Sequence, residues 1–392
     1  TTTLEPPLAS GPYVIDAVDP GRAITYRRNP NYWGARLAVN AGQHNFDEIR
    51  YDYFRDAGVA FEAFKAGDHD LRFEGDATRW ATQYAFPAAT DGRIARSVLQ
   101  TGTPSGLNAL TFNLRKPRFQ NLQVRTALAH AFDFEWVNKT LLHDGYVRTA
   151  SMFTGSDLAP RGAPDGAELA LLEPWRGKIP DAVFGPPYAP PHTDGSGRPR
   201  ANLKKAAALL GAAGWKIVDG RLQNANGNPF QIEITIRRPS NTKIALAYAR
   251  NLKRLGIEAN ARPVESAQFQ GMIDSFDFDM VFGFWGVTLS PGNEQQNYWS
   301  QQTANQPGGR NWAGVADPAV DAMIDALGAA RNRAEMVAAA RALDRILMWN
   351  RYVLPLYHDP GQRLARWARI ARPETIPVYG LRIETLWADD AN

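Results

Sequence analysis

The spacing of hydrophobic and polar residues predicts strands and helices in alternation along the chain. Tyr13 and Ile15, and later Ile24 and Tyr26, alternate with polar neighbours on either side of a turn at 19–22. Pro-Gly at the centre of that turn supplies a fixed φ and then a permissive one. The pattern further predicts a strand over 49–54, a helix over 57–66 and a strand over 70–73. We interpret this strand–helix–strand order as a βαβ unit.

A second strand–helix–strand order lies in the middle of the chain. Residues 230–236 alternate strictly, 242–255 have helical spacing, and 257–261 return to a strand. This pattern predicts a βαβ unit with a right-handed crossover. Residues 278–285 are almost continuously apolar, which is typical of a central strand covered on both faces.

The remaining segments fill in an α/β pattern. Residues 154–200 are rich in Gly and Pro but carry Trp175, Phe184 and Tyr188, which need burial, so we expect an ordered excursion and not a linker. Asn202 is the expected N-cap of one helix, and Asp317-Pro318 starts another. Further helices are predicted over 124–143, 202–213, 318–328 and 333–349, a short strand over 353–357, and a return of the tail through 376–379.

Composition narrows the class of protein. With 44% hydrophobic and 21% charged residues, the chain is globular, and 392 residues suffice for two or three domains. The absence of cysteine excludes disulfides and zinc–thiolate sites. The net charge of +4 comes from basic residues scattered among 40 acids, which argues against nucleic-acid binding. We find no motif for a phosphate loop, a nucleophile elbow or a zinc helix, so we expect neither an enzyme nor a metal or other cofactor.

Several segments, taken together and in order, resemble one family. They are Ser10-Gly11-Pro12-Tyr13-Val14-Ile15, Arg27 to Gly34, Phe61 to Asp70, Leu110 to Leu114, Val124 to Asp133, Ala206 to Trp215, and Asn311 to Asp321. On these motifs the chain is similar to the extracytoplasmic solute-binding proteins, family 5, of peptide ABC transporters. Within that family, segments 45–53, 132–136 and 342–350 look most like the branch associated with uptake of oligopeptides and microcin C.

The resemblance implies an α/β fold of two lobes that close over a ligand like a flytrap, with mixed sheets flanked by helices. Matching segments places lobe one at 1–110 plus 350–392 and lobe two at 111–349. The earlier part of the family fold has no counterpart here, and the chain begins at Thr1 without a leader, which suggests processing or truncation. We therefore expect lobe one to be incomplete at its N-terminal side and to leave sheet edges exposed.

The function implied is that of the periplasmic component of an ABC importer in a Gram-negative bacterium. It would capture a peptide or peptide-like solute and deliver it to the inner-membrane permease, as a monomer. Alternatives are a non-peptide or conjugated solute (a muropeptide, an opine or a sugar conjugate), a hydrolase using Asp277 and Asp279, or a remnant that no longer binds. The two aspartates have strand spacing, which would point both to one side.

The main candidate for ligand binding follows the apolar strand, where open α/β sheets place ligands. It comprises Phe284, Trp285, Thr288, Glu294 and Trp299. In many family members a Trp matching Trp285 is followed three residues later by an Asp that receives the ammonium group of a peptide. Here that residue is Thr288, which cannot supply the same charge-assisted bond, so Glu294 is the alternative anchor. A solvated loop with Trp285 in the core would explain the segment equally simply.

Two further pairs follow strand ends. Arg237 and Arg238 could bind a carboxylate or phosphate, although a solvated turn would carry the same residues. Tyr357 and His358 follow the short late strand, and His358 could donate a hydrogen bond to a ligand. A lone histidine is also an ordinary hydrogen-bonded residue in many folds, so both readings stay open.

Overall fold

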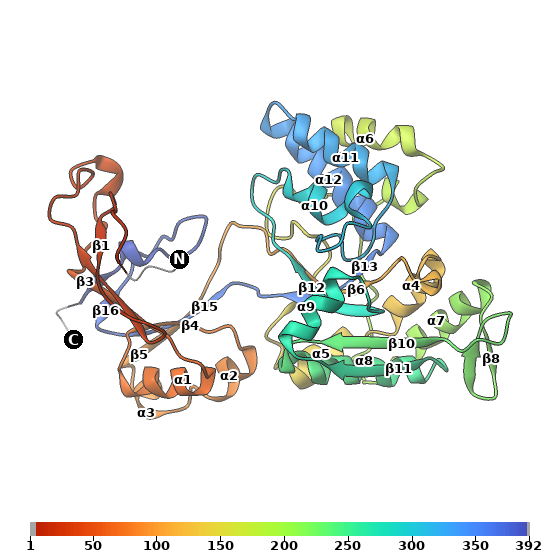
Figure 1. Cartoon of the computed structure of the whole chain (residues 1–392), viewed down its shortest axis with the longest axis horizontal. Helices are drawn as coiled ribbons and strands as arrows, with labels where there is room; N and C mark the ends of the chain where they lie inside the picture. Colours follow the sequence, from red (N-terminus) through yellow and green to blue (C-terminus); the bar gives the residue numbers. More distant parts are fainter. Residues whose placement is uncertain (1–4, 390–392) are drawn as a thin grey trace. The chain divides into compact units, whose positions relative to one another are not determined.

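The computed structural model describes residues 5–389 and divides into two units (Figure 1). Unit 1 consists of Thr1–Gly102 and Pro360–Asn392, and unit 2 of Thr103–Asp359. The predicted lobe boundaries lie at 110/111 and 349/350 instead. The strands at 107–112 and 353–355 pair with each other in the sheet of unit 2. Both strands therefore belong wholly to unit 2.

Unit 2 is built on a mixed sheet with the order β11-β10-β12-β6-β13 in the described part of the chain. The strands β10, β11 and β12 run parallel, as the predicted βαβ unit requires, and β6 runs antiparallel to both of its neighbours. The crossover helix α8 (Thr242–Lys253) packs on β11. The bounds are β6 (Leu107–Phe112), β10 (Gln231–Ile236), β11 (Glu258–Pro263), β12 (Met280–Trp285) and β13 (Val353–Pro355).

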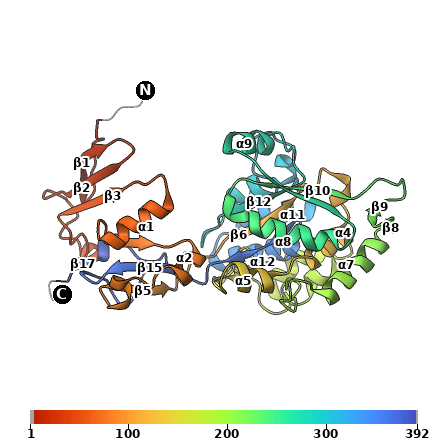
Figure 2. The ribbon, with the colours of Figure 1, turned by 90° about the horizontal axis from the view of Figure 1, so that it is seen from below.

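Helices cover both faces of this sheet (Figures 1 and 2). Along β6, Leu107 and Ala109 enter one hydrophobic cluster, whereas Leu110 and Phe112 enter the other. This period of two is the expected alternation of a strand between two apolar layers. One layer holds α4 (Leu122–His130), α5 (Phe134–Leu141), α7 (Arg200–Ala212) and α8; the other holds α6 (Gly166–Leu172), α10 (Glu294–Trp299), α11 (Pro318–Ala329) and α12 (Arg333–Asn350).

Two helix predictions need correction. The segment 124–143 is not one helix, because the chain breaks after α4 and the side chain of Asp133 caps α5 by accepting from the backbone N–H of Trp136. The predicted N-cap Asn202 lies inside α7 instead, and its amide donates to the backbone carbonyl of His192. Asp133 also accepts from the backbone N–H of Gly197 at 2.9 Å, so a distant segment fixes this cap, and a distant carbonyl likewise holds Asn202.

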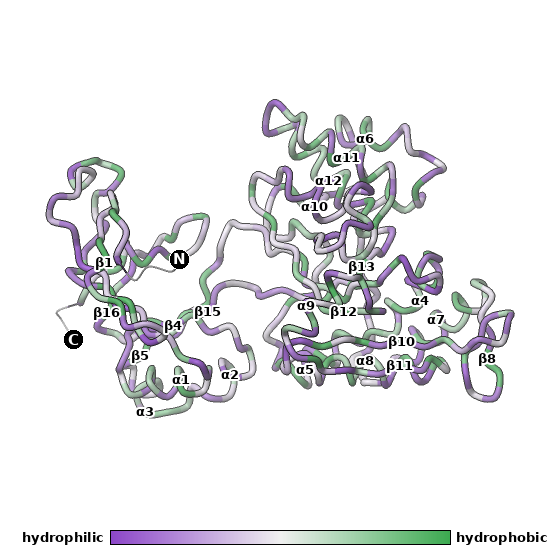
Figure 3. Tube along the Cα trace, in the orientation of Figure 1, coloured by the Kyte–Doolittle hydropathy of each residue, from purple (hydrophilic) through white to green (hydrophobic). Residues whose placement is uncertain are grey.

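The excursion 154–200 is ordered, as predicted, and it is fastened to α12. Arg345 is fully buried, forms an ion pair with Glu168, and donates to the carbonyls of Gly162 (2.6 Å) and Gly185 (2.8 Å). The neighbouring Asp344 accepts from the backbone N–H of Met152 at 2.8 Å. Hydrophobic and hydrophilic residues alternate along the covering helices, as Figure 3 shows. The smaller elements of unit 2 are β7 (Val147–Arg148), β8 (Lys216–Val218), β9 (Arg221–Gln223), α9 (Ser266–Asp274) and β14 (Tyr357–His358).

Unit 1 contains two separate three-stranded sheets among its described residues, with the orders β1-β2-β3 and β4-β15-β5. The first predicted βαβ unit is therefore wrong, because β3 and β4 belong to different sheets. The tail supplies β15, the middle strand of the second sheet, and the short β16, which pairs with β17. No strand forms over 376–379 in this described region. The bounds are β1 (Tyr13–Asp19), β2 (Ala23–Arg28), β3 (Glu48–Asp52), α1 (Ala57–Ala66), β4 (Leu71–Phe73), α2 (Ala77–Thr82), α3 (Pro87–Thr90), β5 (Ile94–Leu99), β15 (Gln362–Trp367), β16 (Ile370–Ala371) and β17 (Trp387–Ala388).

Candidate functional site

The predicted binding residues of unit 2 gather at one edge of its sheet. Because β10 and β12 are parallel, and β13 and β12 are both antiparallel to β6, all three strands end at the same edge. We call residues 237–238, 284–288 and 356–358 the carboxyl edge. The chain also enters unit 2 just before β6 and leaves it just after β14, so both connections to unit 1 start here. The edge is where open α/β sheets place ligands.

Phe284 and Trp285 end β12 with opposite orientations. The Phe284 side chain is 54% exposed, whereas Trp285 is 1% exposed and lies in the hydrophobic core. Gly106, at the start of β6, has a φ of +72°, and a Cβ there would lie 2.9 Å from the Phe284 ring. Phe284 thus offers an apolar surface, bordered by a position that requires glycine.

Trp285 and Trp299 are core residues. Their rings stack with centroids 5.0 Å apart, and Trp312 meets the Trp285 ring edge-on at 5.8 Å. Both Trp285 and Trp299 are 1% exposed. The sequence predicts both of them, with Phe284, to contact a ligand. The structure gives them another role, namely holding the end of β12 and α10 together beneath the exposed edge.

The loop after β12 holds Thr288 and Glu294. The hydroxyl of Thr288 accepts from the backbone N–H of Ser290 at 3.2 Å. Both carboxylate oxygens of Glu294 accept from the backbone N–H of Gly292 at 3.0 Å, and one is 3.3 Å from the side-chain amide of Gln295. Glu294 therefore stabilises the turn that starts α10, and this local role explains its place without a ligand.

Three arginines lie at the end of β10 and beside the end of β12. Arg237 and Arg238 follow β10, and the guanidinium of Arg237 lies 5.2 Å from the centre of the Phe269 ring. Arg310 is not among the residues predicted from the sequence, because it comes from a distant loop. It donates to the backbone carbonyl of Phe284 at 3.3 Å and lies 5.1 Å over the Tyr298 ring. All three side chains are exposed.

Tyr357 and His358 lie at the far side of the carboxyl edge, after β13. Tyr357 is 8% exposed and packs against Tyr146, with ring centroids 4.6 Å apart. The Nδ1 atom of His358 is 3.0 Å from the hydroxyl of Thr149. Burial lowers the pKa of His358, which favours the neutral form of its ring. Of this pair only His358 retains surface through which a ligand could be contacted.

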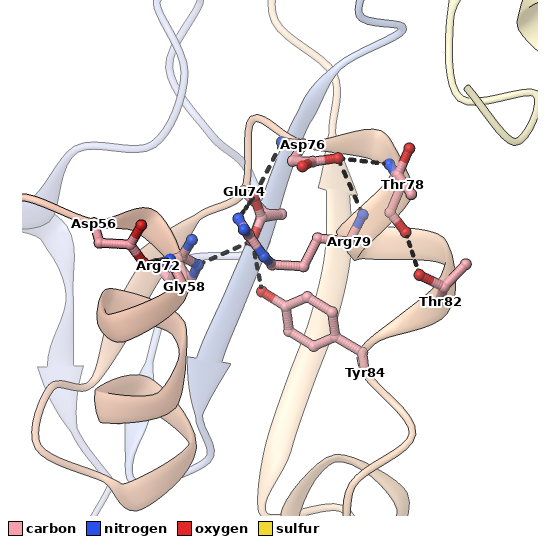
Figure 4. Close-up of polar contacts among 9 residues, drawn as sticks. All are labelled: Asp56, Gly58, Arg72, Glu74, Asp76, Thr78, Arg79, Thr82 and Tyr84. Atoms are coloured by element: carbon pink, nitrogen blue, oxygen red, sulfur yellow. Dashed lines mark hydrogen bonds and ion pairs between the residues drawn. The ribbon is translucent and has the colours of Figure 1, made fainter. Parts of the chain in front are cut away.

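Unit 1 carries a polar cluster at the end of β4 (Figure 4). The buried carboxylate of Glu74 accepts from Arg72 at 2.9 Å and from Arg79 at 3.4 Å. It also accepts from the backbone N–H of Asp76 at 3.0 Å. The Tyr84 hydroxyl reaches it at 3.5 Å. Two cations and a backbone donor satisfy this buried charge, which indicates a structural role.

The paired aspartates of the hydrolase alternative are not arranged as predicted. β12 begins at Met280, so Asp277 and Asp279 precede the strand and do not share its spacing. Asp279 forms an ion pair with Arg118 and accepts from the backbone N–H of Glu233 at 3.0 Å. Both residues lie at the opposite edge of the sheet from Phe284, and the spacing argument for catalysis no longer holds.

Within residues 5–389, no group of three or more histidine, aspartate or glutamate side chains is placed to hold a metal ion. None of the helices there has both the length and the apolar character needed to cross a membrane.

Comparison with known proteins identifies the class and then the family. The oligopeptide-binding protein AppA of Bacillus subtilis, solved with a nonapeptide, superimposes with a TM-score of 0.68 at 20% identity, covering 97% of this chain and 66% of AppA. The fold is thus the α/β fold of periplasmic binding proteins, as predicted. The chain belongs to the bacterial extracellular solute-binding proteins, family 5, whose middle region matches residues 1–307.

Similar curated proteins extend over nearly all of this chain. A Brucella melitensis protein, described by name only as a binding protein, is 46% identical over 98% of this chain and 63% of its own length. Two proteins of Agrobacterium fabrum are each 40% identical over 98% of this chain: "Probable peptide-binding protein YejA", covered over 63% of its length, and "Peptidoglycan-binding protein YepA", covered over 64%. The chain therefore spans somewhat less than two thirds of these relatives.

Proposed function

We propose that this chain is the solute-binding component of an ABC importer and that it captures a peptide or peptide-like solute at the carboxyl edge of unit 2. The observation that carries the proposal is the exposed Phe284, which stands at the end of a central strand where three strand ends and both inter-unit connections converge. An exposed aromatic over a packed core is typical of a binding surface.

The solute is peptide-like on two grounds. An exposed apolar side chain at a strand end suits a ligand that alternates side chains with polar amides. The names of the two Agrobacterium relatives mention peptide and peptidoglycan. Peptides and peptidoglycan both contain amino acids, so a muropeptide stays a specific alternative to a plain oligopeptide.

The rest of the proposal follows from the family. The protein acts outside the cytoplasmic membrane, in the periplasm, as a monomer that delivers its solute unchanged to a membrane permease. Glu294, the acid in the loop that adjoins Phe284, is held by its own turn, which supports binding and not catalysis at this edge. Hinged units would make binding a shift between pre-existing arrangements.

Native mass spectrometry of the protein purified from its producing cells tests this function. A co-purified mass of amino-acid composition, lost from a Phe284→Ala variant but retained by a variant at a distant exposed residue, Leu246→Ala, is the expected result. A protein that remains empty, and that also binds no member of a peptide or muropeptide library, would overturn the proposal.

A further inference from the structure

We infer that unit 2 holds a small inorganic anion of the halide class, chloride, in its interior, bound by the guanidinium groups of Arg148 and Arg351 and by the hydroxyl of Tyr188. The inference goes beyond the proposed function, because such an ion would stabilise unit 2 whether or not a solute is bound. It would join three segments that are distant in the sequence, namely β7, the excursion 154–200 and the residue that ends α12.

The first argument is the state of Arg148. All three nitrogens of its guanidinium are buried, and among residues 5–389 none of them has a hydrogen-bond acceptor. The group lies instead on two aromatic rings, 4.8 Å from the centre of Phe132 and 5.3 Å from that of Phe134. Burial lowers the pKa of Arg148 to about 10, so the group stays charged at pH 7. A buried charge without a partner is strongly destabilising, and it calls for a counter-charge.

Two other buried arginines of unit 2 show how this fold satisfies such a side chain. Arg125 donates to backbone carbonyls at distances of 2.7 to 3.1 Å, and Arg345 pairs with the carboxylate of Glu168. Arg148 has neither kind of acceptor. The charge of Glu135 acts on it, but the oxygens of that carboxylate accept from a histidine and a threonine. The acceptor that Arg148 requires is therefore not supplied by these neighbours.

The second argument is a second cation beside the same hydroxyl. The guanidinium of Arg351 lies 5.4 Å from the ring centre of Tyr188 and 5.4 Å from that of Trp349, and these two rings meet edge-on at 5.3 Å. Burial raises the pKa of Tyr188, and the charges of Arg351 and Arg148 both oppose this rise. The Tyr188 hydroxyl is thus within electrostatic reach of both guanidinium groups.

The third argument is that the cluster offers many donors and few acceptors. Besides Arg148, the buried Nε of Arg351, Nε1 of Trp349 and hydroxyl of Tyr188 have no hydrogen-bond partner among the described residues. Guanidinium and indole nitrogens only donate. A water molecule there would still have to place its own hydrogens, whereas a halide ion accepts several hydrogen bonds and donates none. A negative ion also offsets the repulsion between the two arginines.

The experiment is urea unfolding of the full chain in mixtures of sodium chloride and sodium gluconate at constant ionic strength. An ion that binds only the folded state stabilises it by mass action. We therefore expect the urea midpoint of the parent to rise with the logarithm of the chloride concentration as chloride replaces gluconate. Crystals grown in sodium bromide should show an anomalous peak in contact with the guanidinium of Arg148.

Variants separate this site from a general effect of salt. Arg148→Met should be at least as stable as the parent without chloride, because an unpaired buried charge is gone, and chloride should add nothing to it. Tyr188→Phe removes a single donor and should raise the chloride concentration needed for the same effect about tenfold. Arg161→Met changes an exposed arginine of the same excursion and should keep the full response.

Two outcomes would overturn the inference. One is an equal response of the parent and Arg148→Met to chloride. The other is a parent whose stability ignores the exchange of gluconate for chloride, since water would then satisfy the donors. If Arg148→Met does not fold, Tyr188→Phe and the position of bromide decide, and bromide found only away from Arg148 would contradict the site. Each outcome leaves the proposed capture of a solute to its own test.

Discussion

Phe284 and Trp285 are adjacent in one strand, yet one is exposed at the proposed binding surface and the other packs in the core. The ring of Trp285 packs against Trp299 in the core, while that of Phe284 stands 54% exposed. A strand sends successive side chains to opposite faces, so an apolar run can supply both a core and a binding surface. The two residues should therefore respond differently to truncation.

We expect Trp285→Ala to lower the free energy of unfolding by roughly 3–5 kcal/mol, because it opens a cavity in the core. Phe284→Ala should leave that free energy within about 1 kcal/mol of the parent, since the ring is mostly in solvent. It should instead weaken solute binding. Urea denaturation and calorimetric titration of both variants check this. A large loss of stability in Phe284→Ala would show that Phe284 is a packing residue.

Asp344 is expected to make stability depend on pH. Burial raises the pKa of its carboxyl group to about 7, although the Met152 N–H opposes this. The folded chain therefore retains a proton that the unfolded chain releases near its ordinary value of 3.8. Stability should fall as the pH rises between these two values, and the loss should persist above the higher one.

Asp344→Asn removes this titration and keeps an oxygen that can accept from Met152. As the pH rises from about 4 to about 7, the free energy of unfolding of the variant should increase relative to that of the parent, by up to about 1.4 kcal/mol per pH unit. Urea denaturation across this range measures the difference. Parallel pH profiles for the two proteins would show that Asp344 does not titrate there.

Among helices and strands, α12 organises unit 2 through its buried charge. Arg345 reaches from α12 to Glu168 on α6 and to the carbonyls of Gly162 and Gly185, which ties the whole excursion to one helix. Removing one partner of a buried pair leaves the other charge uncompensated. Arg333 and Arg341 of α12 also contact Asp157 in the excursion, but Arg345 is the buried one, so we expect its loss to matter most.

We expect Arg345→Met to destabilise unit 2 by about 3–5 kcal/mol and to open the excursion to proteases. A double variant that also changes Glu168 to Leu should recover much of the loss, since no unpaired charge then remains. Urea denaturation measures the stability, and limited proteolysis locates the first cleavage. If the double variant is no better than the single one, the bonds to the backbone carbonyls matter more than the ion pair.

Local patterns predicted elements well and their partners poorly. The helix at 57–66 and the parallel strands β10 and β11 are as expected, because capping and alternation depend on residues that are neighbours in the sequence. The chain break at Asp133 and the separate sheets of β3 and β4 depend on contacts between distant segments. Pairing is decided by burial and register over the whole fold, and one sequence window does not contain that information.

The candidate site could be predicted in part for the same reason. Strand ends are visible in the sequence, so Arg237, Phe284 and His358 could each be named in advance as residues at a strand end. That they share one sheet could not, because the predicted lobes placed His358 apart from the other two. The sequence does not tell whether a residue at a strand end faces solvent or the core. Trp285, for example, is predicted to contact a ligand but is buried. Arg310 could not be found because the loop that carries it approaches the edge only in the fold.

Over the whole chain, the two units have separate hydrophobic cores. We expect differential scanning calorimetry to resolve two unfolding transitions, since a cooperative transition normally belongs to one core. A saturating solute of unit 2 should raise the transition of unit 2 by mass action. A single transition, with equal calorimetric and van't Hoff enthalpies, would show that the units unfold together.

The middle strand of one unit 1 sheet, β15, is also the last long strand of the chain. Its partners β4 and β5 are made early, and all of unit 2 is synthesised before β15 can be inserted between them. During that interval two strand edges wait unpaired, which is the state most prone to association with other chains. Loss of the chain from residue 362 onward would make the condition permanent. A nonsense mutation that removes β15 should therefore be damaging even though it leaves all of unit 2 intact.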